Sequence, residues 1–226
     1  MTLALSETRQ NVPVPERVPA LPYRTTAQLN EGLDHVRAAP ADAGVVRLVV
    51  RRPTAGEREV LDEGQLDLAH GMVGDDWLPR ARSRAMADGR HLASQVNVMS
   101  ARMVALLAES AEEQAYAGDQ LYLDLDISVA NLPTGSRLEF GEPGADGPVL
   151  EVSAKPHNGC AKFVARYGED AARFVNSETG KALRLRGFNA RIVEPGRVRP
   201  GDAVRVVPRG GLDDQTALPA EVSTPV

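Results

Sequence analysis

The chain has 226 residues, a net charge of −5, 42% hydrophobic residues and one cysteine. No apolar run reaches the roughly 18 residues that a membrane-spanning helix needs, and the first residues lack the basic and apolar regions of a secretory signal. One cysteine cannot form an internal disulfide, which is typical of a protein in a reducing compartment. We therefore expect a cytoplasmic protein without membrane contacts.

Residues 1–44 predict a loosely ordered leader that carries one short helix. Four closely spaced prolines lie within residues 13–22 and disfavour regular structure there. Thr25 and Gln28 have the spacing of a capping box, which begins a helix. Hydrophobic residues then follow at helical spacing, and Pro40 ends the run that contains Leu29, Leu33 and Val36.

Residues 45–207 predict one main domain in which most elements are strands. Val45–Val50 is rich in β-branched residues, and residues 121–127 alternate hydrophobic and polar side chains, as a half-buried strand does. Ser100 is a suitable N-cap for a helix. Short strands separated by glycine and proline turns favour a mostly β fold with a few helices (α+β), as a barrel or a sandwich. The other expected strands are 58–68, 96–99, 137–140, 149–153, 189–193 and 203–207.

Positive charge gathers in one part of the chain. Residues 1–150 contain 14 arginines, no lysine and 22 acidic residues, whereas residues 151–209 contain 9 arginines, all 3 lysines and 6 acidic residues. Residues 208–226 predict a C-terminal tail. A basic segment in an acidic chain favours an anionic small molecule or cofactor as ligand. A nucleic-acid partner is disfavoured, because the whole chain is acidic and stacking aromatics are few.

Cys160 is the candidate nucleophile. It lies between Lys155, His157 and Lys162, and neighbouring cations stabilise the thiolate, which is the reactive form. Hydrophobic residues follow it at helical spacing up to Gly168, so Cys160 would lie at the positive end of a helix. A lone cysteine is more often a small buried hydrophobe, but the basic surroundings favour a functional thiol. A zinc site is disfavoured, because it needs three or four ligands and the other histidines are scattered.

Several motifs, in the same order along the chain, resemble the MOSC domain family, which is named for the C-terminal domain of molybdenum cofactor sulfurase. The resemblance spans about residues 45–207 and implies a MOSC-type β-barrel. The motifs that carry it include Gly71-Met72-Val73-Gly74-Asp75, Leu132-Pro133-Thr134-Gly135, Asn158-Gly159-Cys160-Ala161-Lys162-Phe163 and Arg184-Leu185-Arg186-Gly187.

The resemblance implies a protein that handles sulfur, the molybdenum cofactor (molybdopterin), or both. Cys160 would carry a persulfide or ligate molybdenum, and His157 and Lys162 would activate the thiol. The residues expected to bind the cofactor are Lys155, Asn158, Arg166, Asn176, Arg184, Arg186 and Asp75.

Two of these assignments have structural alternatives. Arg184 and Arg186 alternate along a stretch that predicts extended backbone, which would place both on one face, either as an anion clamp or as an ordinary solvated surface. An aspartate such as Asp75 in a glycine-rich loop is more often a turn residue than a ligand.

Three functions remain open. The protein could be an enzyme, either a sulfurtransferase or a molybdenum-dependent oxidoreductase; it could be a non-catalytic carrier of the cofactor; or it could be an accessory protein that delivers sulfur in a biosynthetic pathway. A sulfur donor such as a cysteine desulfurase is the expected partner, and a redox partner would serve the oxidoreductase. We expect no pyridoxal phosphate, because the chain offers no second large domain to hold it.

Overall fold

The structure is a computed structural model, and it describes residues 12–14, 23–81, 83–142 and 147–210. Its strands are β1 (Val12–Val14), β2 (Ala43–Arg51), β3 (Arg58–Leu61), β4 (Gly64–Asp67), β5 (Gly71–Met72), β6 (Val96–Ser100), β7 (Leu121–Asp124), β8 (Arg137–Phe140), β9 (Val149–Val152), β10 (Phe188–Glu194), β11 (Gly196–Val198) and β12 (Ala203–Val206). Its helices are α1 (Thr26–Glu31), α2 (Leu33–Arg37), α3 (Ser83–Ala87), α4 (Ala101–Leu107), α5 (Ala111–Ala115), α6 (Ala161–Asn176), α7 (Glu178–Ala182) and the 3₁₀ helix η1 (Arg90–Ser94).

Seven of the described strands close into a barrel. They follow the order β2-β12-β8-β9-β10-β6-β7, and β7 pairs back onto β2. The long strand β2 makes this closure possible, because one of its edges pairs with β7 while the other pairs first with β12 and then with β3. Only β6 and β7 run parallel among the described barrel pairings. The expected mostly β fold with a few helices is confirmed.

The barrel encloses one of two hydrophobic clusters. Its interior is filled by inward-facing aliphatic side chains from successive strands, as the two-residue period of a strand requires. Val46, Leu121, Phe140 and Val204 are all fully buried there.

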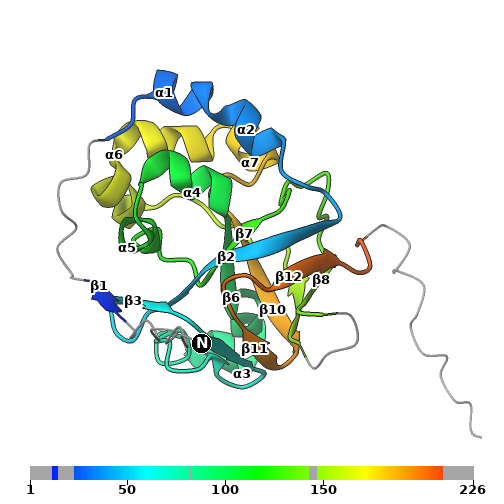
Figure 1. Cartoon of the computed structure of the whole chain (residues 1–226). Helices are drawn as coiled ribbons and strands as arrows, with labels where there is room; N and C mark the ends of the chain where they lie inside the picture. The colour runs from blue at the N-terminus through cyan, green and yellow to red at the C-terminus, as the bar shows by residue number, and fades with distance from the viewer. Residues whose placement is uncertain (1–11, 15–22, 82, 143–146, 211–226) are drawn as a thin grey trace, which may run out of the picture.

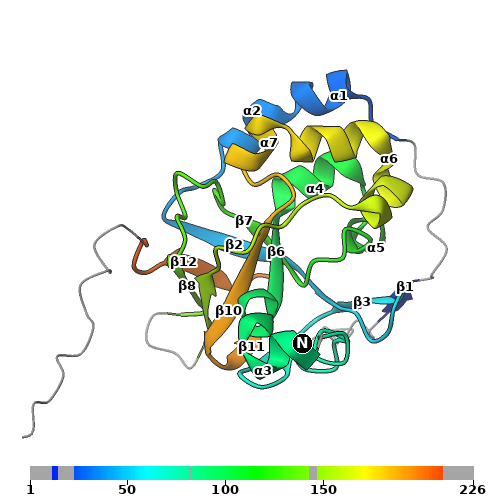
Figure 2. The same cartoon turned by 180° about the vertical axis from the view of Figure 1, so that it is seen from behind.

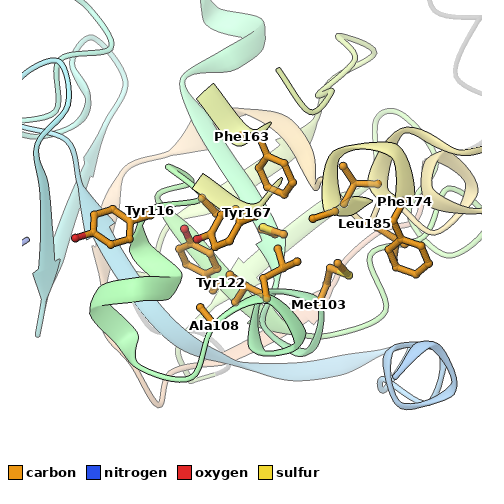
Figure 3. Packing of buried hydrophobic residues seen from close by; sticks show 14 of the residues in the cluster. Met103, Ala108, Tyr116, Tyr122, Phe163, Tyr167, Phe174 and Leu185 are labelled. Atoms are coloured by element: carbon orange, nitrogen blue, oxygen red, sulfur yellow. The ribbon is translucent and has the colours of Figure 1, made fainter. Parts of the chain in front are cut away.

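The second cluster lies between the barrel and a layer of helices. Figures 1 and 2 show α1, α2, α4, α5, α6 and α7 gathered at one end of the molecule, whereas α3 lies at the opposite end near β11. Tyr122 of β7 points into this layer, together with Met103 of α4 and with Phe163 and Tyr167 of α6 (Figure 3). The strand predicted over residues 121–127 is observed as Leu121–Asp124, but it is not half-buried at Tyr122, which is fully buried because helices cover this part of its outer face.

Residues 23–44 belong to the folded body rather than to a loose appendage. The capping box at Thr25 is confirmed, but the run forms two short helices that meet at Gly32. A Cβ at Gly32 would come within 2.3 Å of the Leu106 side chain, so the two chain segments pack tightly there. Leu29 is fully buried in the helical layer, which explains why this part departs from the expected loose leader. β1 pairs with β3, and residues 1–11, 15–22 and 211–226 of the predicted leader and tail lie outside the described residues.

The break at Gly168 is confirmed. Gly168 has φ +86° and ψ +170°, so α6 consists of two helical pieces that meet at this residue. The first piece begins directly after Cys160 and carries Phe163 and Tyr167 into the core. The fold therefore fixes the direction of the helix on which the candidate thiol lies.

Candidate functional site

Cys160 lies at the start of α6, where the loop from β9 turns into the helix. The residue is exposed and occupies the N-cap position with extended backbone. Burial by itself would raise the pKa of the thiol, but the backbone N–H groups of Phe163 and Lys162 and the charges of Arg186 and Arg166 outweigh that effect and lower the pKa below its usual value. The expected position of the thiol at a positive helix end is therefore observed.

A buried carboxylate, Asp119, joins two of the predicted site residues. Its Oδ1 lies 2.7 Å from Nε2 of His157, and its Oδ2 accepts a hydrogen bond of 2.6 Å from Nη1 of Arg186. Burial opposes ionisation of Asp119, but Arg186 and His157 outweigh it, so its pKa lies below the usual range. Arg186 also donates to the carbonyl oxygen of Ala117 and lies over the ring of Phe163, with 5.1 Å from Cζ to the ring centroid.

Burial favours the neutral form of His157. Burial lowers its pKa from the ordinary value, and repulsion by Arg186 adds to that effect, whereas Asp119 opposes it only in part. Because Asp119 is a carboxylate, Nε2 of His157 carries the hydrogen and donates it, which leaves Nδ1 able to accept a proton. His157 can therefore serve as a base near the thiol rather than as the cation that a protonated histidine would be.

A second buried pair comes from the N-terminal half of the chain. Arg52 follows β2, and its Nη2 and Nε donate to the two carboxylate oxygens of Asp75 at 2.8 and 2.9 Å. Its Nη1 donates to Asn97 and to the carbonyl oxygen of Gly118, each at 3.0 Å. Burial would lower the pKa of Arg52, but the hydrogen bond and charge of Asp75 raise it overall, so the cation is held firmly.

Arg58 and Arg166 both lie close to Gly118, and neither forms an ion pair with a carboxylate in the described part of the chain. Gly118 has φ +86°, and a Cβ there would lie 3.0 Å from Nη2 of Arg58 and 3.4 Å from Nη1 of Arg166, so a side chain would fill the space between the two guanidinium groups. Burial, together with repulsion by Arg166 and Arg52, lowers the pKa of Arg58 to about 10. Burial also lowers the pKa of Arg166, whose Nη1 donates to the carbonyl oxygen of Tyr116.

These groups line one small cavity, which we call the Cys160 cavity. Its volume is about 230 Å³, and Cys160, His157 and Phe163 form part of its wall. Asp76 is the carboxylate among its described lining residues, and it pairs with Arg80 at 2.7 Å. The cationic side chains that line it are Arg52, Arg58, Arg80, Lys162, Arg166 and Arg186.

A much larger groove adjoins this cavity, and we call it the Trp77 groove. It has a volume of about 1180 Å³ and shares Arg52, Arg80, Asn97 and His157 with the Cys160 cavity. Trp77 and His91 stack in it with ring centroids 5.5 Å apart. The stacked rings and the bordering cations and amides suit a flat, polar, anionic molecule.

The structure gathers part of the predicted site around the thiol. His157, Lys162, Arg166 and Arg186 line the Cys160 cavity together with Cys160. Lys155 and Asn158 instead lie at the boundary between the Trp77 groove and a third cavity of about 390 Å³, and Nζ of Lys155 donates to Ser94.

Three predicted cofactor binders make hydrogen bonds within the protein. Asp75 accepts hydrogen bonds from the backbone N–H groups of Arg52 and Trp77 as well as from the Arg52 side chain, so its oxygens are already used. Asn176 bonds to both the N–H and the carbonyl oxygen of Gly159, which holds the loop before the thiol.

The third is Arg184, and its predicted geometry is wrong. Residues 183–186 form a turn rather than an extended stretch, and Arg184 has φ +48°. Its Nη1 donates to the carbonyl oxygen of Leu132 at 2.6 Å, whereas Arg186 reaches Asp119. The two arginines therefore do not alternate along a strand as predicted; they bond to different partners, although both line the third cavity.

Sequence reasoning missed Asp119 and three cations, Arg52, Arg58 and Arg80. All four lie far from Cys160 along the chain, in the half whose net charge is negative. Asp119 followed by alternating hydrophobic residues gave only a strand signal. Arg52 and Arg58 bracket the connection between two predicted strands, so their position at strand ends was the one available hint.

Metal and membrane sites of the usual kinds are not found among the described residues. No three His, Cys, Asp or Glu side chains are grouped as they would be to hold a metal ion by themselves. No helix in the described ranges is long and apolar enough to span a bilayer.

The sequence profile of the MOSC domain matches residues 81–205, more than half of the chain. The chain belongs to the MOSC domain family. The matched range contains Cys160, His157 and Asp119, whereas Arg52 and Arg58 precede it. The resemblance inferred from the motifs is confirmed.

Solved structures similar to this MOSC chain include three from bacteria, and no curated protein sequence matches it significantly. YuaD from Bacillus subtilis is 16% identical over 73% of this chain and 95% of that chain, with a TM-score of 0.47. YiiM from Escherichia coli is 19% identical over 74% and 71% of the two chains, with a TM-score of 0.46. YiiM from Geobacillus stearothermophilus is 20% identical over 52% and 56%, with a TM-score of 0.40.

Proposed function

We propose that this protein handles sulfur for the molybdenum cofactor and that Cys160 carries the sulfur as a persulfide. The observation that carries the proposal is an exposed thiol with a lowered pKa in a cavity whose lining cations outnumber its carboxylates. A thiolate is the form that accepts sulfane sulfur, and the resulting persulfide is an anion that nearby cations stabilise. Membership of the MOSC domain family supports the same assignment.

The residues around the thiol divide into clear roles under this proposal. His157 accepts the proton of the Cys160 thiol and passes it to solvent, because burial favours its neutral form and its Nε2 is already bonded to Asp119. Asp119 is a positioning residue that fixes the ring and the tautomer of His157. Lys162 and Arg166 supply positive charge beside the sulfur.

The residues present fit the molybdenum cofactor. Trp77 and His91 offer an aromatic surface on which a pterin ring could stack in the Trp77 groove. Arg80, Arg90 and Lys155 border the same groove and could pair with a phosphate. A cysteine thiolate is the soft ligand that molybdenum favours, and the cofactor would supply that soft metal centre as acceptor or redox centre.

A carrier of the intact cofactor is the second candidate, and the volume of the Trp77 groove favours it. The groove, at about 1180 Å³, exceeds the roughly 300–1,000 Å³ typical of small-molecule sites. In that case molybdenum would copurify without turnover and Cys160 would ligate it.

The test is intact mass and elemental analysis of native protein and of Cys160→Ala, with Arg173→Gln as control because Arg173 is exposed on the far part of α6. We expect a +32 Da adduct or bound molybdenum in the native protein and the control, and neither in Cys160→Ala. The rate of alkylation of the native thiol by iodoacetamide should reach half its maximum at a lower pH than that of an unperturbed cysteine thiol, since the pKa is lowered. A midpoint at or above that of the unperturbed thiol, or full retention of metal by Cys160→Ala, would make Cys160 structural.

A further inference from the structure

The charges of the Cys160 cavity are only partly balanced by the protein. Arg52, Arg80 and Arg186 have carboxylate partners in Asp75, Asp76 and Asp119. The remaining cations, Arg58, Lys162 and Arg166, have no ion pair among the described residues. With Cys160 as the thiolate and His157 neutral, two positive charges remain unmatched, which is the charge that a dianion would neutralise.

Two buried guanidinium groups also have one nitrogen each without a hydrogen-bond partner among the described residues. Arg58 and Arg186 are each only 7% exposed, and Nε of each has no partner in the described part of the chain. The described hydrogen bond of Arg58 goes from Nη1 to the neighbouring carbonyl oxygen of Glu57. A buried donor without an acceptor destabilises the folded state, so an oxygen-rich anion in this cavity would relieve an existing cost. The pKa of Arg58 is also lowered, because burial and the neighbouring cations disfavour its charge. A bound anion would oppose this effect.

The size of the cavity restricts the anion. A volume of about 230 Å³ is below the range of drug-sized ligands, so the dianion is small. The anion also shares the cavity with a thiolate, and two anions come together only where cations offset their repulsion. A dianion that contains an electrophilic sulfur could therefore both bind here and react with Cys160.

We propose that the Cys160 cavity binds thiosulfate, a small dianion with a sulfane sulfur, and that Cys160 takes its persulfide sulfur from it. Arg58 and Arg166, both close to Gly118, hold the sulfonate oxygens, and the outer sulfur faces Cys160. This inference rests on the proposed persulfide function and names the donor for it. Because the donor binds the same cavity as the thiol, no donor protein has to dock for loading.

The transfer is balanced without any further reactant. The Cys160 thiolate attacks the outer sulfur of thiosulfate and forms an S–S bond with it. The bond between the two sulfurs of thiosulfate breaks, and its electron pair leaves with sulfite, which carries two negative charges. The total charge is unchanged, no proton is consumed and no oxidant is needed. Arg58 and Arg166 stabilise the charge that gathers on the departing sulfite.

The experiment supplies thiosulfate to the reduced full chain and follows the +32 Da adduct by intact mass and released sulfite by a colorimetric assay. We expect one sulfite for each adduct. Sulfate should compete with loading, since it would occupy the site proposed for the sulfonate oxygens. It should change the rate at which uncharged iodoacetamide alkylates Cys160 by less than twofold. Loading that is insensitive to sulfate, or an adduct without sulfite, overturns the inference.

The matched variants are Arg58→Gln and Arg173→Gln. Arg58→Gln should slow loading by thiosulfate at least tenfold and iodoacetamide alkylation less than threefold, whereas Arg173→Gln should change neither. Inorganic polysulfide serves as a second donor. Loading by polysulfide but not by thiosulfate overturns the thiosulfate inference and leaves the proposed persulfide function of Cys160 intact. Failure of both donors overturns the thiosulfate inference and the persulfide function together. If Arg58→Gln does not fold, the sulfate competition on the native protein decides by itself.

Discussion

At the scale of single residues, Asp119 positions two side chains of the site, although it lies far from Cys160 in the sequence. It is fully buried, and each of its oxygens holds a different partner, His157 or Arg186. A buried carboxylate with two partners fixes the positions of both side chains. Its removal would also leave the buried partners without a neutralising charge. The position of the base and of a cavity cation therefore depends on a residue that does not itself line the cavity.

Asp119→Asn should destabilise the fold by about 3–5 kcal/mol, because it leaves Arg186 as a buried charge without its partner. Asp34→Asn is the control, since Asp34 forms an exposed pair with Arg37 and should cost about 1 kcal/mol or less. Urea unfolding measures both. Because the folded pKa of Asp119 is lowered, its stabilising contribution is present above the unfolded pKa and is lost as the pH falls through the folded value. The difference between wild type and Asp119→Asn should therefore shrink below about pH 4; a constant difference would contradict this account.

The residue scale also shows where sequence reasoning reached its limit. Cys160, His157, Lys162 and Arg166 lie close together along the chain, so a local motif was enough to group them. Arg58 could not be predicted in the same way, because it reaches the thiol only once β3 pairs with β2 and the barrel has closed.

At the scale of elements, the break in α6 sets the direction of the helix that starts at Cys160. Gly168 adopts backbone angles that are accessible essentially only to glycine, and a Cβ there would lie 2.9 Å from the ring of Tyr23. The first helical piece is thus held against the core by Phe163 and Tyr167 and ends at this break.

Gly168→Ala should cost about 1–3 kcal/mol of stability from backbone strain, with an added cost from contact with Tyr23. It should also change the alkylation rate of Cys160, because the first helical piece would shift. Gly89→Ala is the matched control, since Gly89 also has positive φ but a Cβ there would meet nothing within 4 Å. Equal effects of the two variants on the thiol would show that the break does not position Cys160. Thermal unfolding and iodoacetamide kinetics supply the two measurements.

Elements with strong periodicity were predicted well and the short ones were not. β2, β6, β8, β9, β10 and β12 were each expected within about two residues of their observed bounds, because β-branched runs and glycine or proline turns mark them. β5 and β11 have two and three residues, too few to show a period. α5 was not predicted either, although Ser110 at its N-cap and Glu113 in its first turn form a capping box.

At the scale of the whole molecule, the barrel and the helical layer share β2, β6 and β7. These strands send one set of side chains into the barrel and the other set under the helices. Burial on both faces explains why the pattern at Tyr122 misled the prediction of a half-buried strand. The helical layer also includes α1 and α2, from the segment expected to be a leader.

Leu29→Ala tests whether α1 belongs to the folded body. Leu29 is fully buried, so the substitution should cost about 2–5 kcal/mol by loss of packing and creation of a cavity. Leu68→Ala, at a side chain that is 49% exposed, should cost less than about 1 kcal/mol. Urea unfolding again provides the comparison. If Leu29→Ala left the free energy of unfolding nearly unchanged, residues 23–44 would be an appendage and not part of the folded body.

The single cysteine sets an upper bound on what one molecule can do. Since the whole sequence has no second thiol, Cys160 has no resolving partner within its own chain. A sulfur atom bound there can depart only to an acceptor outside this chain. As a persulfide, Cys160 holds one transferable sulfur, so delivery of two sulfurs from the persulfide would require either two visits or two molecules.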